Sequence, residues 1–97
     1  MPHGWPVLHI HIRSDGSVDN EVVNVSKSRK EEVVWSSENE AFEIHFQDTP
    51  FEHQIFHVPA RGAIRSGPPR GVLGAYPYTI TSASTSMSAD PVINVVP

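Results

Sequence analysis

The 97-residue chain contains no cysteine, which excludes disulfide bonds, thiolate metal sites and catalysis by a thiol. It also lacks any apolar run approaching the roughly 18 residues that a membrane-spanning helix needs, so we expect no membrane partner. The N-terminal MPHGWPVLHIH has no basic segment followed by an apolar one and does not resemble a signal peptide. We therefore expect a cytoplasmic protein as the sequence stands, or a periplasmic or secreted one if a leader has been removed.

Positive charge is scarce. Seven Lys and Arg stand against eleven Asp and Glu, a net charge of -4 with histidine neutral. An acidic chain without a broad basic face is a poor ligand for nucleic acid, and we predict no such partner. Arg61, Arg65 and Arg70 follow one another in a Gly/Pro-rich stretch and could together hold one anion. A stretch of this kind is also typical of a solvated loop.

The main signal along the chain is alternation of apolar and polar residues, which is typical of half-buried strands. The cleanest run, residues 41–47, places Phe42, Ile44 and Phe46 on one face and His45 on the other. Nine Pro and six Gly favour several short strands joined by turns. The predicted strands cover residues 7–14, 21–26, 32–37, 41–47, 54–59, 75–82 and 91–96.

Two longer stretches, residues 60–71 and 81–90, are predicted to be loops because they are rich in Gly and Pro or in small polar residues. Pro77 has no N–H, so its strand is expected at a sheet edge or with that nitrogen facing away from a neighbour. The pattern predicts one all-β domain over residues 1–97, a β-sandwich of about seven strands without a helix.

Three motifs occur along the chain in a fixed order. The first is a strand that ends in V-x-W before a polar turn, the second is a G-x-Y-x-Y step, and the third is a short apolar closing strand. They comprise Val33 with Trp35, then Gly74, Tyr76 and Tyr78, then residues 91–96. Over residues 20–96 this series resembles the cupredoxin family, the plastocyanin-like copper proteins. The resemblance implies a Greek-key β-sandwich with a type 1 copper at one end.

That copper is held in the family by two His, one Cys and a weak axial Met. The resemblance places the Cys at or beside Ile80, where this chain has none, and no His follows in TSASTSMSA. Met87 is the candidate for the axial position, and His45 is the nearest candidate for the upstream His. Because the thiolate is missing, blue-copper electron transfer is not inherited, and we expect no resident cofactor.

Six histidines nevertheless leave room for another metal site. His9 and His11 lie two residues apart on one strand face, roughly 6.5–7 Å along the strand. With His45 or a nearby acid they could bind copper or zinc. His53 and His57, at a loop-to-strand corner, form a second such pair. The alternative interpretation is ordinary outward polar patterning, so a histidine-based protein for copper or zinc storage or delivery is our second hypothesis.

Catalysis has little support in the sequence. The serines lie in stretches of small residues without a G-x-S-x-G elbow, and Glu38, Glu40 and Glu43 are typical of a solvated turn. We therefore predict a copper-free, cupredoxin-like module that is not an enzyme and that binds a protein partner or forms a homo-oligomer. It would present residues 36–40, 48–53 and 81–90 and its strand edges. The apolar segment 91–96 is predicted to be the most prone to edge pairing.

Overall fold

A computed structural model describes residues 7–82 and 91–97, and within these residues all regular structure is β-strand. The all-β prediction is confirmed. No described segment forms a helix long and apolar enough to cross a membrane. The eight strands are β1 (Val7–Ile12), β2 (Val22–Ser26), β3 (Glu32–Ser37), β4 (Phe42–Phe46), β5 (Ile55–Val58), β6 (Ala63–Arg65), β7 (Gly74–Thr81) and β8 (Val92–Val96).

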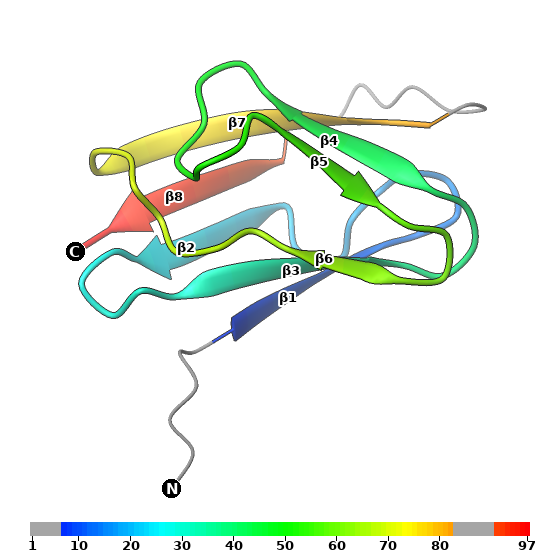
Figure 1. The fold of residues 1–97 in the computed structure, drawn as a ribbon, viewed down its shortest axis with the longest axis horizontal. Coiled ribbons are helices and arrows are strands. Elements are labelled where there is room, and N and C mark those ends of the chain that lie inside the picture. The colour runs from blue at the N-terminus through cyan, green and yellow to red at the C-terminus, as the bar shows by residue number, and fades with distance from the viewer. Residues whose placement is uncertain (1–6, 83–90) are drawn as a thin grey trace, which may run out of the picture.

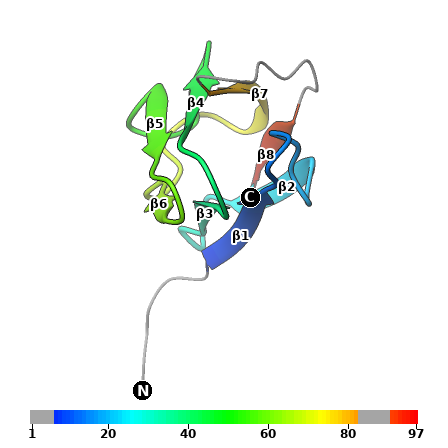
Figure 2. The same ribbon diagram turned by 90° about the vertical axis from the view of Figure 1, so that its right-hand side faces the viewer.

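The strands form two sheets that face each other (Figures 1 and 2). The small sheet has the order β1-β3-β6, and the large sheet has the order β2-β8-β7-β4-β5. The pairs β1–β3 and β2–β8 are parallel, and the other pairs are antiparallel. Except for β4–β5 and β7–β8, consecutive strands belong to different sheets. This arrangement is consistent with the predicted β-sandwich.

The core lies between the sheets and is built by the inward half of each alternating strand. Successive side chains of a strand point to opposite faces, so every second residue is buried. Leu8 is partly buried against this core. The inward face predicted for residues 41–47 is confirmed, because Phe42, Ile44 and Phe46 are buried. The same alternation buries Ile10, Ile12, Val23, Val25, Val33, Trp35, Phe56, Val58, Tyr76, Tyr78 and Ile80.

The strand that the sequence did not predict is β6, which lies inside the expected loop 60–71. It pairs antiparallel with β3 and closes one edge of the small sheet. Three residues are too few for alternation to be recognised. Ser66, the residue after β6, also helps to hold β6 against β3. Its backbone N–H donates to the Val33 carbonyl at 2.8 Å, and its Oγ accepts from the Val33 N–H at 2.9 Å.

Replacing Ser66 by alanine is expected to lower the free energy of unfolding by about 1–3 kcal/mol, because the N–H of buried Val33 loses its acceptor. Urea denaturation followed by circular dichroism measures this loss. The exposed Ser28→Ala is the matched control and is expected to unfold like the wild type within about 0.5 kcal/mol. Equal stability of the two variants would contradict the role of Ser66.

Strand β8 lies between β2 and β7 and is paired on both sides. Residues 91–96 are therefore not a sheet edge, and the prediction that this segment is the most prone to edge pairing is wrong. Its pairing partners lie far away in the sequence, at Val22–Ser26 and Gly74–Pro77. Local apolar character therefore does not show whether such a strand is central or at an edge.

Strand β7 is also central, so Pro77 does not lie at an edge. Its pairing with β4 ends at Phe46 opposite Tyr78, and continuing the register would place Pro77 opposite Gln47. The Gln47 carbonyl instead accepts from the side-chain amide of Gln54 at 3.3 Å. The missing N–H of Pro77 thus falls where the β4 ladder stops, so it removes no hydrogen bond of that ladder.

Candidate functional site

The histidines predicted to bind metal are distributed over both sheets. His9 and His11 are on β1 in the small sheet, and His45 is on β4 in the large sheet. Each has buried strand neighbours, Ile10 and Ile44 among them, so all three imidazoles point outward from opposite sides of the core. The predicted set of His9, His11 and His45 is therefore not brought together around one ion.

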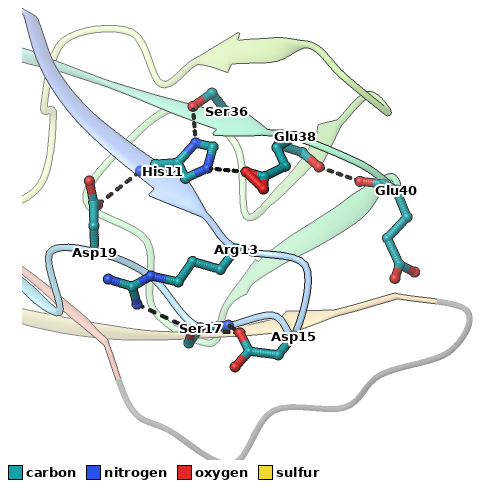
Figure 3. Close-up of polar contacts among 9 residues, drawn as sticks. His11, Arg13, Asp15, Ser17, Asp19, Ser36, Glu38 and Glu40 are labelled. Atoms are coloured by element: carbon teal, nitrogen blue, oxygen red, sulfur yellow. Dashed lines mark hydrogen bonds and ion pairs between the residues drawn. The ribbon is translucent and has the colours of Figure 1, made fainter.

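His11 belongs to a polar network along β1 and β3 (Figure 3). Its Nδ1 lies 3.3 Å from Ser36 Oγ and its Nε2 lies 3.3 Å from Glu38 Oε1. Its backbone N–H donates to Asp19 Oδ1 at 2.9 Å, and its carbonyl accepts from the Asp19 N–H at 3.1 Å. Both ring nitrogens thus already have polar neighbours, and the network ties the outer edge of β1 to the segment that follows it.

The turn after β1 is held by a second set of contacts, of which those among Arg13, Asp15 and Ser17 are drawn in Figure 3. Ser17 donates to Asp15 Oδ1 from its hydroxyl at 2.6 Å and from its backbone N–H at 2.9 Å. The hydroxyl contact is the main reason why the pKa of Asp15 lies below its usual value. Arg13 Nη1 donates to the Val18 carbonyl at 3.0 Å. These contacts stabilise the turn and indicate a structural role for its charged residues.

A different cluster, which the sequence did not predict, lies on the outer face of the large sheet. The Glu43 carboxylate stands between two imidazoles, with Oε1 3.0 Å from His45 Nε2 and Oε2 3.3 Å from His57 Nδ1. Glu43 and His57 are opposite each other in the β4–β5 register. In residues 7–82 and 91–97, however, no group of three or more His, Cys, Asp or Glu is arranged to hold a metal ion.

Two of the three arginines predicted to bind an anion contact carboxylates. Arg65 Nη2 lies 3.1 Å from Glu32 Oε2, and Arg70 Nη2 lies 4.0 Å from Glu52 Oε1. Arg61 is in the turn before β6, whereas Arg70 is in the loop after it. Carboxylates repel an anion, so these two contacts do not favour the predicted anion site.

A hollow of about 620 Å³, which we call the end groove, lies where β4 begins and where β5 and β7 end. These strand ends gather with β6 at the right-hand end of Figure 1. Residues from both sheets line it, and the lining is mostly apolar. We call its apolar residues the wall and its polar residues the rim. The wall includes Phe42, Val58, Pro59, Ala63 and Ile64, and the rim includes Glu43, His57 and Thr81.

The residues that the cupredoxin resemblance placed near copper lie in different surroundings. Ile80 is buried in the core, and the next residue, Thr81, lines the end groove. His45 points outward, and Met87 lies outside the described residues. No protein-family model matches the chain, and no curated protein shows significant similarity to it. The case for a function therefore depends on the groove and the polar groups at its rim.

Proposed function

We propose that this chain is a copper-free, cupredoxin-like Greek-key sandwich that acts as a non-catalytic binding module and takes an apolar group of a partner into the end groove. The connections between the two sheets support this fold, because β4 pairs with β7 across the intervening β5 and β6. Long-range pairing of this kind occurs where a strand returns beside an earlier one, as in a Greek key.

The observation that carries the proposal is the end groove itself. Its volume lies within the range of small-ligand sites, and such sites are mostly apolar with a few polar groups that orient the ligand. The resemblance to cupredoxins implies that a copper ion would be held at the end of β7. Here that position offers Ile80 and Thr81 in place of a thiolate, and the wall beside it is formed by carbon-rich side chains.

We expect the neutral apolar dye Nile red to bind to the folded protein, with amide chemical-shift changes confined to the strands that line the groove. Ile64→Trp enlarges a half-buried, inward-facing side chain of the wall and should weaken binding at least about fivefold, equivalent to ~1 kcal/mol of lost contact. The matched control is Thr79→Trp, an exposed strand position at a separate hollow. Unchanged binding by Ile64→Trp, or no binding by the wild type, would overturn the proposal.

A further inference from the structure

We propose that the occupant of the end groove is a segment of a partner protein in which an apolar side chain stands beside a lysine or arginine. The apolar side chain lies in the groove, and the cationic group reaches Glu43 at the rim. This inference rests on the proposed function and names the chemistry of the partner. Two features support this inference: the charge of the rim and the backbone groups of β5 beside the groove.

The rim is electrostatically one-sided. Among the described residues that line the groove, Glu43 is the one Asp, Glu, Lys or Arg. Within residues 7–82 and 91–97, its charged-group contacts are with the His45 and His57 imidazoles, and none is with a Lys or Arg side chain. The whole chain is also acidic, with a net charge of -4. A cationic group near the rim is attracted, and an anionic one is repelled.

One side of the Glu43 carboxylate is accessible. The His57 side chain, which faces Oε2, is 75% exposed, so few packing contacts hold it in place. Turning it toward solvent frees one carboxylate oxygen while His45 keeps the other at 3.0 Å. Thr81 stands opposite Glu43 in the β4–β7 register and lines the same groove. Its hydroxyl provides a second oxygen that can accept a hydrogen bond from an ammonium or guanidinium group.

A polypeptide is favoured over a small amine because strand β5 has an open edge beside the groove. The Phe46 N–H donates to the Gln54 carbonyl, so residues 54, 56 and 58 pair with β4 and the backbone groups of Ile55 and His57 face away from it. No backbone hydrogen bond from residues 7–82 or 91–97 reaches these groups. An extended segment can pair its own backbone there while one side chain enters the groove.

The test compares three peptides, Ac-Gly-Phe-Lys-Gly-NH2 and its relatives with Gln or Glu in place of Lys, in amide chemical-shift titrations. We expect the Lys peptide to bind about two- to fivefold more tightly than the Gln peptide, and the Glu peptide to bind most weakly. Glu43→Gln should abolish these differences without preventing binding of the Gln peptide. The matched control is Glu52→Gln, another exposed glutamate, which should preserve them.

The outcomes separate this inference from the proposed function. If the three peptides bind equally to the wild type while Nile red still enters the groove, the inference fails and the proposed function stands. If neither peptide nor dye binds, both fail. If 3-phenylpropylamine binds as tightly as the Lys peptide, the polypeptide part of the inference is overturned. Groove signals that shift with protein concentration alone would indicate a second copy as the occupant and would also overturn it.

Discussion

Replacing Trp35 by alanine is expected to lower the free energy of unfolding by about 3–5 kcal/mol. Trp35 is completely buried on β3, and its ring is surrounded by four other aromatic rings. The centroid distances to Phe46, Phe51, Phe56 and Tyr78 are 6.1, 6.2, 5.1 and 5.7 Å. Truncation to alanine removes the Trp35 ring from all four contacts. It leaves a cavity that the rigid strands of the two sheets cannot close.

Such a loss is a large fraction of the stability of a small domain, so part of the Trp35→Ala population should be unfolded without denaturant at moderate temperature. Guanidinium denaturation followed by far-ultraviolet circular dichroism measures the effect. Trp35→Phe, which keeps one ring in place, should lose less than Trp35→Ala. Val72→Ala, at a side chain that is 75% exposed, should change stability by no more than about 0.5 kcal/mol. A Trp35→Ala variant within ~1 kcal/mol of the wild type would contradict this account.

The inward faces could be predicted from the sequence because they depend only on the period of a strand. Once residues 41–47 form a strand, Phe42 and Ile44 must share a face, whatever the strand pairs with. Pairing itself is non-local. The β2–β8 ladder joins Val22 to Val92, and no local pattern marks that partnership. For this reason β8 was predicted to be the segment most prone to edge pairing, although it is central.

The same limit explains the errors at the sites. Alternation correctly puts His9, His11 and His45 outward but does not show that β1 and β4 belong to different sheets. The contact of Glu43 with His57 requires the β4–β5 register, which depends on the length of the intervening loop. Aligning residues 41–47 with residues 54–59 as a hairpin, with residues 48–53 as its loop, could have suggested this contact.

The end groove could not have been predicted from any stretch of sequence alone. Its walls come from four separate places, at the beginning of β4, the ends of β5 and β7, and the short β6. The last of these had no recognisable strand pattern. Sites of this kind arise where strand ends from two sheets meet, so they follow from topology and not from a motif.

The stability of the protein is expected to fall by about 2 kcal/mol between pH 10 and pH 12 because of Tyr78. Burial raises the pKa of Tyr78 from 10.0 to about 12, and the hydrogen bond donated by Trp35 Nε1 to its hydroxyl at 3.3 Å opposes part of that rise. Below pH 10, both the folded and the unfolded chain keep the phenol proton. Above it the unfolded chain releases the proton first, so the free energy of unfolding decreases with pH until the folded chain also ionises.

Urea denaturation at pH 8, 9, 10 and 11 isolates this contribution when the wild type is compared with Tyr78→Phe. The variant should start about 1–2 kcal/mol lower, because the Trp35 N–H loses its acceptor inside the core. It should then decline less steeply above pH 10, so the stability curves of the two proteins converge as the pH rises. Val72→Ala, which changes no tyrosine and leaves Tyr78 and Trp35 in place, should retain the wild-type slope. Parallel curves for the wild type and Tyr78→Phe would show that the phenol of Tyr78 does not couple its ionisation to folding.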